Sequence, residues 1–270
     1  MRTQRIGDVD VIRDQVTIPG LGVLPINAFL VCAEQPVLVD TGRPVEREAF
    51  LTALRGLIDP AELRWIWLTH PDRDHLGSLF EVLDLAPGCR LVTTFTAAGY
   101  LSVEYPVPMD RVRLVNPGES LDVGGGRRLR AFRPPLFDSP MTVGFLDEDS
   151  GVCISSDCFG GPMPTAHDAD ADDISTIDPE AVRAGQLVWA AADSPWIHHV
   201  DPARFARTYD VLREARPTAV LSAHLPPVVG ETDVLLDFLA EAPSCAEFTG
   251  PDQRALEALL AGGPQPAETV

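Results

Sequence analysis

The sequence predicts an α/β (α+β) protein in which two mixed β-sheets pack face to face, with helices on the outside. Short apolar runs rich in Val, Ile and Leu dominate the first half of the chain, and few helical patterns lie between them. Helical patterns dominate the last third. This order matches neither a strict alternation of strands and helices nor an all-β protein.

The predicted strands are short apolar segments with turn residues on both sides. The triplet Gly124–Gly126 and the pair Pro134–Pro135 mark tight turns between them. We expect strands at 9–18, 26–32, 36–39, 65–68, 90–94, 111–115, 128–133, 142–146 and 151–155, and a late strand at 219–222.

Helices are expected where apolar residues recur every three or four positions. In the segment 45–57, for example, one face carries Phe50, Leu51, Leu54 and Leu57. We expect helices at 45–57, 74–85, 179–192, 202–215, 231–241 and 252–261.

With 270 residues, the chain is long enough for one large domain or two small ones. No linker rich in Gly, Ser and Pro divides its middle, so we expect a single domain over 1–261. Residues 262–270 are rich in Gly and Pro and predict a flexible tail. The acidic segment 162–178 predicts a long loop that is a lid or simply mobile.

The charge of the chain excludes several classes of partner. Its net charge of −19 argues against nucleic acid and against anionic lipid, which both require clustered Lys and Arg. No segment approaches the ~20 apolar residues of a membrane span, and no secretion signal is visible. The five scattered cysteines fit reduced thiols, so we expect a cytoplasmic protein. An acidic surface is compatible with a homodimer but does not require one.

The segment 69–77 (Thr-His-Pro-Asp-Arg-Asp-His-Leu-Gly) carries the strongest functional signal. It directly follows the predicted buried strand 65–68, and it contains two imidazoles and two carboxylates: His70, Asp72, Asp74 and His75. Groups at the carboxyl end of a strand can point into one crevice. The simpler interpretation is a polar turn with Asp72 or Asp74 as the helix N-cap, but a turn does not need both histidines. The segment therefore favours a divalent metal site.

Three more strand ends carry groups that suit such a site. The strand at 36–39 leads to Asp40, the strand at 151–155 to Asp157, and the strand at 219–222 to His224. Each position has an alternative interpretation by itself, because an Asp before Thr-Gly is common turn chemistry. Together, and in this order, the four segments predict one site.

These segments resemble the metallo-β-lactamase superfamily, whose four-layer αββα sandwich carries two metals. The resemblance extends from about residue 8 to residue 241. Hydrolases of the superfamily usually carry His where Asp72 stands, and a carboxylate there resembles the oxygen-binding diiron domain of flavodiiron proteins. Asn27 in the second strand and the pair Ser156-Asp157 also resemble that diiron domain.

The resemblance also implies a role for each matching residue. His70 and Asp72 would bind the first metal, Asp74, His75 and His224 the second, and Asp157 would bridge both. Asp74 and Asp157 would also be the catalytic carboxylates. Asp40 would hold a ligand histidine in the correct tautomer from outside the metal shell.

One position departs from the family pattern. Leu136 stands where the family supplies another histidine to the first metal, and leucine cannot bind a metal. Three alternatives stay open: a first metal that is under-coordinated, weakly held or absent. Asp138 or His167 is a candidate replacement. His198 and His199 either line the pocket or lie in an exposed turn.

The expected cofactor is a pair of metal ions. Three carboxylates facing two divalent ions lower the Lewis acidity of the ions and tolerate a higher oxidation state. This favours iron over zinc or manganese, although the order of metal affinities alone does not choose among the three. The expected function is binding or reduction of O₂ or a related small oxidant, or oxidation of a small substrate. No phosphate-binding Gly-rich segment is visible, so we expect no flavin in this chain and electrons from a separate donor.

Two other functions compete. A metal-bridging hydroxide could hydrolyse a small ester, lactone, thioester or amide. Alternatively, a site that has lost its metal chemistry could serve structure or partner binding. Leu136 in the place of a ligand supports this alternative, and the presence of the other expected ligands argues against it. Cys158, next to Asp157, is expected to be buried packing and not chemistry.

Overall fold

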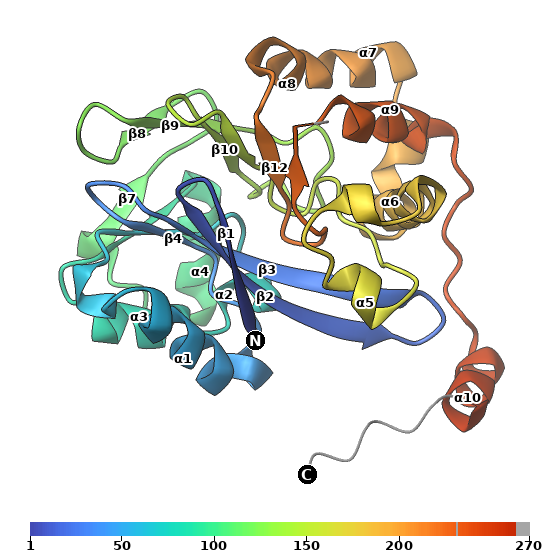
Figure 1. The fold of residues 1–270 in the computed structure, drawn as a ribbon, viewed down its shortest axis with the longest axis horizontal. Coiled ribbons are helices and arrows are strands. Elements are labelled where there is room, and N and C mark those ends of the chain that lie inside the picture. The colour runs from blue at the N-terminus through green and yellow to red at the C-terminus, as the bar shows by residue number, and fades with distance from the viewer. Residues whose placement is uncertain (231, 263–270) are drawn as a thin grey trace.

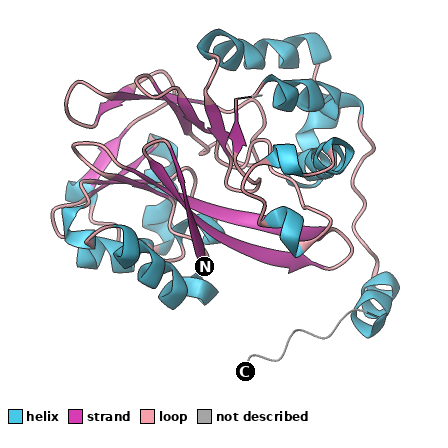
Figure 2. Cartoon of the chain, viewed as in Figure 1, coloured by secondary structure: helices cyan, strands magenta, loops and turns pink. Residues whose placement is uncertain are grey.

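The computed structural model describes residues 1–230 and 232–262 of the chain, and it has four layers (Figure 1). Two β-sheets lie in the middle, with helices on both outer sides (Figure 2). The predicted αββα architecture is confirmed. The strands are β1 (Arg2–Ile6), β2 (Val9–Ile18), β3 (Gly22–Val31), β4 (Val37–Val39), β5 (Trp65–Trp67), β6 (Arg90–Thr93), β7 (Val112–Leu114), β8 (Ser120–Asp122), β9 (Arg128–Phe132), β10 (Gly144–Asp147), β11 (Val152–Ile154), β12 (Ala219–Leu221) and β13 (Val228–Val229).

Both sheets are mixed. The first has the order β1-β2-β3-β4-β5-β6-β7; β1 to β4 pair antiparallel, and β4 to β7 pair parallel. The second has the order β13-β12-β11-β10-β9-β8, with one parallel pair, β11 and β12. Each sheet thus has parallel neighbours whose carboxyl ends lie at one edge. These edges are where open α/β sheets place their sites.

The helices form the outer layers. They are α1 (Arg47–Leu57), α2 (Arg73–Leu76), α3 (Leu79–Leu85), α4 (Phe95–Glu104), α5 (Ala166–Ala169), α6 (Pro179–Asp193), α7 (Pro202–Ala206), α8 (Asp210–Ala215), α9 (Asp233–Glu241) and α10 (Gln253–Gly262). In Figure 1, α1 to α4 cover the first sheet, and α6 to α9 cover the second.

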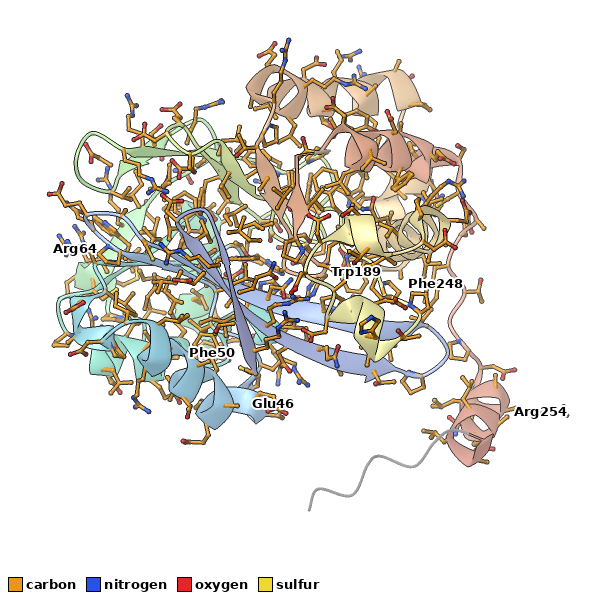
Figure 3. All side chains as sticks on the ribbon, viewed as in Figure 1. Glu46, Phe50, Arg64, Trp189, Phe248 and Arg254 are labelled. Atoms are coloured by element: carbon orange, nitrogen blue, oxygen red, sulfur yellow. The ribbon has the colours of Figure 1, made fainter. Side chains whose placement is uncertain are left out.

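Three apolar clusters fill the spaces between the layers. Trp67 and Phe29 of the first sheet meet Phe145 of the second in the central cluster. Phe50 of α1 belongs to the cluster between the first sheet and its helices, and Figure 3 shows it on that side. Tyr209 belongs to the cluster between the second sheet and its helices. Burial on both faces explains why the central strands read as continuous apolar runs.

The prediction of a single helix over 74–85 is wrong, because the helix is interrupted after α2. Gly77 packs against the segment that leaves β4, and a Cβ on Gly77 would lie 2.3 Å from the carbonyl oxygen of Gly42. The amide of Gly77 donates to that same oxygen at 2.9 Å. This close backbone approach ends α2 and turns the chain into α3.

Other elements differ from the predictions in extent. The helix expected at 202–215 is divided into α7, a 3-10 turn and α8. The sequence patterns missed β1, β8, β13 and α4, since β1 and β8 are mostly polar, β13 has two residues and α4 has little amphipathic contrast.

The segment 162–178, expected as a long loop, is not entirely a loop. This segment contains α5 and a 3-10 helix, and it lies against the β1–β2 hairpin. The buried guanidinium of Arg13 donates to the carbonyl oxygen of Ala171 at 2.7 Å. Arg2 forms ion pairs with Asp170 and Asp172. Two arginines of the first sheet therefore hold the acidic segment in place.

The helix α10 lies apart from the main body in Figure 1, next to the turn that joins β2 and β3. Its Leu259 faces Gly20 in that turn. The predicted tail from residue 263 onward lies outside the described residues, so the domain boundary at 261 stays a prediction. None of the helices in the described part of the chain has the length and apolar character needed to cross a membrane.

Candidate metal centre

Four loops that follow parallel strands build the site. Asp40 follows β4, and the segment that contains His70 and His75 follows β5. Asp157 follows β11, and His224 follows β12. Each sheet thus contributes the loops of two neighbouring parallel strands, and the structure brings these loops together at one edge of the sandwich.

Three imidazoles point at one carboxylate. The Nε2 atoms of His75 and His224 lie 3.1 and 3.4 Å from Oδ1 of Asp157, and the Nε2 atom of His70 lies 3.4 Å from Oδ2. Asp157 therefore faces one histidine with one oxygen and two histidines with the other. A carboxylate in this arrangement has one oxygen available to each of two cations.

The carboxylates of three more aspartates complete the ring. Oδ2 of Asp74 lies 3.5 Å from Nε2 of His224 and 3.8 Å from Nε2 of His75. On the other side, Asp72 and Asp138 lie 4.0 and 3.9 Å from Nε2 of His70. The donor atoms form three groups, each within 4.8 Å: His70 with His75 and Asp157, Asp74 with His75 and His224, and His70 with Asp72 and Asp138.

The far side of each ring is fixed by a hydrogen bond. Nδ1 of His75 donates to Oδ2 of Asp40 at 2.8 Å, and Nδ1 of His224 donates to the carbonyl oxygen of Pro25 at 2.9 Å. Because a carboxylate and a carbonyl can only accept, Nδ1 of both rings carries a proton, and Nε2 is the nitrogen that faces the pocket. Nδ1 of His70 lies 3.2 Å from the Ser156 hydroxyl. All three Nε2 atoms are thus presented to the pocket as ligands require.

Asn27 positions the loop that carries His224. Its amide group donates to the carbonyl oxygens of Ser222 and Leu225, at 3.0 and 2.8 Å, and its backbone amide donates to Ala223. Asn27 is therefore a cross-sheet support for the loop, which accounts for its place next to the site.

Two residues of the site have strained backbone. Asp40 and Ser156 have φ angles of 57° and 54°, which residues other than Gly seldom adopt. Asp40 accepts from the amide and the hydroxyl of Thr69, both at 2.8 Å, and these bonds hold it in that conformation. Such strain is often found where function needs a side chain in a fixed place.

The donor set fits a cation. Among the described residues, Nε2 of His70, Nε2 of His75 and Oδ1 of Asp157 are buried and have no hydrogen-bond partner. Leaving buried polar atoms unpaired costs free energy, and native proteins seldom do so without a reason. Two divalent ions, one next to His70 and one next to His75, would satisfy all three.

The electrostatics agree with this interpretation. Burial by itself raises the pKa of Asp157, but the three imidazoles outweigh it and hold this pKa well below its usual range. Burial lowers the pKa of His224, but Asp157 and Asp74 raise it to about 9. The same competition raises the pKa of His75. The carboxylates around these histidines thus favour a positive charge at the imidazole nitrogens, from either a proton or a metal ion.

The structure separates the remaining predicted residues. Leu136 is buried in the apolar cluster between the second sheet and its helices, as is Cys158, whose pKa burial raises to about 12. His167 is exposed on α5. His198 and His199 belong to a 3-10 helix, Pro195–His199. In the described part of the chain, none of the three histidines joins the groups of ligand atoms.

Two residues near the site escaped the sequence analysis. Asp193 is the last residue of α6. Burial, together with the charges of Asp157 and Asp138, raises the pKa of its carboxyl group to about 7. The Trp189 ring, labelled in Figure 3, lies one helical turn earlier, 5.0 Å from the His224 ring. Both lie on a helix whose pattern indicated only packing, so periodicity gave no signal for them.

The four layers and the pocket of imidazoles and carboxylates define the class: a metallo-β-lactamase-like protein with a candidate two-cation centre. Residues 24–181 match the family model described as "ODP family beta lactamase", and the chain belongs to this family.

Comparisons with known proteins place it on the predicted branch. The chain is 31% identical over 155 residues to diflavin flavoprotein A 1 of Synechocystis sp., covering 57% of this chain and 26% of that protein. It is 28% identical over 134 residues to the anaerobic nitric oxide reductase flavorubredoxin of Salmonella arizonae, covering 50% and 28%. The chain spans about a quarter of the length of these curated relatives.

Among solved structures, rubredoxin oxygen:oxidoreductase from Desulfovibrio gigas superposes with a TM-score of 0.76 at 17% identity. The match covers 89% of this chain and 61% of that one. The resemblance to flavodiiron cores is thus confirmed at the level of fold.

Proposed function

We propose that this chain is the diiron part of an oxidoreductase that reduces a small oxidant such as O₂ or nitric oxide. The observation that carries the proposal is a pocket in which three buried nitrogen and oxygen atoms have no hydrogen-bond partner among the described residues, within a ring of carboxylates. The names of the Salmonella and Desulfovibrio proteins, a nitric oxide reductase and an oxygen oxidoreductase, support the choice of oxidant.

In this proposal each residue keeps the role that the resemblance implied. His70 and Asp72 hold the first ion, Asp74, His75 and His224 hold the second, and Asp157 bridges them. Asp40 and the carbonyl oxygen of Pro25 fix the tautomers of two ligand histidines.

A pair of ferrous ions bound there would supply two electrons for the reduction of a small oxidant. The chain's own residues orient these ions and limit access to them, because five of the six proposed ligands are at least partly buried. Asp193 lies on the pocket side of α6 with a pKa near 7, which suits a group that passes protons to a bound oxidant. Electrons would come from a separate donor. A cytoplasmic location and a homodimer stay predictions.

Anaerobic purification with metal analysis tests the proposal. We expect about two irons per chain and a change in the visible spectrum when air or nitric oxide is added. Two zinc ions with turnover of a chromogenic ester, and no spectral response to oxidants, would instead indicate a hydrolase. Less than one metal of any kind would contradict both functions.

The bridge provides a second test. Asp157→Ala should remove most of the bound metal, because Asp157 faces all three ligand histidines. The exposed Asp59, which caps a 3-10 helix and belongs to none of the groups of ligand atoms, provides the control Asp59→Ala, which should retain two metals. Unchanged metal content in Asp157→Ala would overturn the assignment of the bridge.

A further inference from the structure

We propose that Asp138 is a ligand of the first metal position, where it replaces the histidine that the chain lacks. This inference rests on the proposed two-metal centre. It gives the first position one imidazole and three carboxylates, from His70, Asp72, Asp138 and Asp157. The second position has two imidazoles and two carboxylates, so the two positions differ in chemical character.

The geometry of Asp138 suits this role. Its Oδ1 accepts a hydrogen bond from the Thr142 hydroxyl at 3.0 Å, which fixes the carboxylate plane and leaves Oδ2 free. Oδ2 lies 3.9 Å from Nε2 of His70. One cation can touch two donor atoms at this separation, since each metal–ligand bond is about 2 Å long.

His70 provides a second, independent observation. Its side chain is fully buried, and its Nε2 atom has no hydrogen-bond partner among the residues that the structure describes. Carboxylate oxygens of Asp157, Asp138 and Asp72 surround this atom at 3.4, 3.9 and 4.0 Å. Three carboxylate oxygens around one buried nitrogen atom repel each other unless a positive charge lies between them.

The loop that carries Asp138 is held in place on both sides. The indole of Trp196 donates to the carbonyl oxygen of Phe137 at 2.8 Å. The Arg133 guanidinium donates to the carbonyl oxygen of Pro140 at 2.6 Å. Leu136 packs into the apolar cluster behind the loop. The same turn therefore buries Leu136 and presents Asp138, two residues later, to His70.

The exchange of an imidazole for a carboxylate has two consequences. Four carboxylates balance the charge of two divalent ions, where three would leave one positive charge. Carboxylate-rich sites also suit Mn²⁺ and Fe²⁺ better, relative to Zn²⁺, than imidazole-rich sites do. The first position should therefore discriminate less against Mn²⁺ than the second position does.

Metal titration of three variants tests the inference. Asp138→Asn retains an acceptor for Thr142 but removes the charge, and Asp138→Ala removes both. We expect each variant to bind one Mn²⁺ per chain where the unmodified protein binds two, with the loss of the spin-coupled Mn²⁺ pair signal in electron paramagnetic resonance. His167→Ala, which alters the other candidate replacement, should bind two.

Asp138→His tests the chemical character of the position. It should retain two metals but raise the preference for Zn²⁺ over Mn²⁺ at the weaker site by about tenfold. Far-ultraviolet circular dichroism of every variant verifies that the fold is intact.

The outcomes separate this inference from the proposed function. Two Mn²⁺ ions bound with unchanged affinity in Asp138→Asn and Asp138→Ala would overturn the role of Asp138 and leave the two-metal centre intact. An unmodified protein that binds fewer than two ions of iron, manganese or zinc would overturn the centre itself.

Discussion

Each ligand histidine depends on an acceptor that lies far from it in the sequence. His75 relies on Asp40, and His224 relies on the carbonyl oxygen of Pro25. Asp40 accepts three hydrogen bonds in a left-handed backbone conformation, so its carboxylate is fixed before any metal arrives. At this scale, hydrogen bonds on the far side of the rings keep three Nε2 atoms facing Asp157.

Asp40→Asn should weaken metal binding without abolishing it. An amide cannot accept three hydrogen bonds as a carboxylate does, so His75 loses its fixed tautomer. We expect metal affinity to fall roughly 10–100-fold, measured by competition with a chromogenic chelator. Asp59→Asn should leave the affinity unchanged. An unaltered affinity in Asp40→Asn would show that Asp40 serves the fold alone.

At the scale of elements, Gly77 determines how the ligand segment meets β4. Gly77→Ala places a methyl group 2.3 Å from a backbone oxygen, so the loops of Asp40 and His75 must separate. We expect a loss of about 1–3 kcal/mol of stability and weaker metal binding. Gly56→Ala in α1 meets open space and should stabilise the protein by about 0.5–1 kcal/mol. Denaturant unfolding of both variants measures the contrast.

The ion pair of Arg127 and Asp147 joins the β8–β9 turn to β10, and it predicts a pH dependence of stability. Burial alone would raise the pKa of Asp147, but Arg127 and Ser150 outweigh it and lower this pKa. A depressed carboxyl pKa contributes stability above the unfolded value of about 3.9, and the contribution is lost as the pH falls through the folded value.

Arg127→Met should therefore cost about 3–5 kcal/mol at pH 7, because it leaves a buried carboxylate unpaired. The difference from the unmodified protein should shrink below about pH 4, where Asp147 takes up a proton. Arg113→Met, at an exposed position of β7, should change stability by less than about 0.5 kcal/mol at either pH. A cost that stays constant with pH would contradict this account.

At the scale of the whole molecule, the metal centre connects the two sheets. Four of its proposed ligands follow β5 of the first sheet, and the other three follow β9, β11 and β12 of the second sheet. Ions bound there would hold the sheets together, and a ligand that binds the folded state alone raises the stability of that state.

Metal removal should thus lower the melting temperature. At a free metal concentration 100 times the Kd, the stabilisation is about 2.7 kcal/mol, which corresponds to roughly 5–10 °C. Calorimetry with and without a chelator measures this shift, and Asp157→Ala should show none. An equal shift in both proteins would mean that the chelator acts elsewhere.

The sequence by itself determined the parts of this protein that local chemistry controls. The buried strand 65–68, followed by His70, Asp72, Asp74 and His75, was sufficient to predict that these side chains lie in one pocket, because groups at a strand end are encoded within a few residues. Alternating apolar and turn residues likewise predicted the two sheets and most of their strands.

The tertiary structure alone decided which groups complete the pocket. Asp138 joins His70, whereas His167, His198 and His199 do not. The acceptor for His224 is the backbone carbonyl oxygen of Pro25. Every residue has such an oxygen, so the sequence could not predict which one would accept this bond. The physical reason is that loop conformation depends on contacts remote in sequence, such as Trp196 with Phe137. Side chains on different loops meet only after the packing of both sheets has placed them.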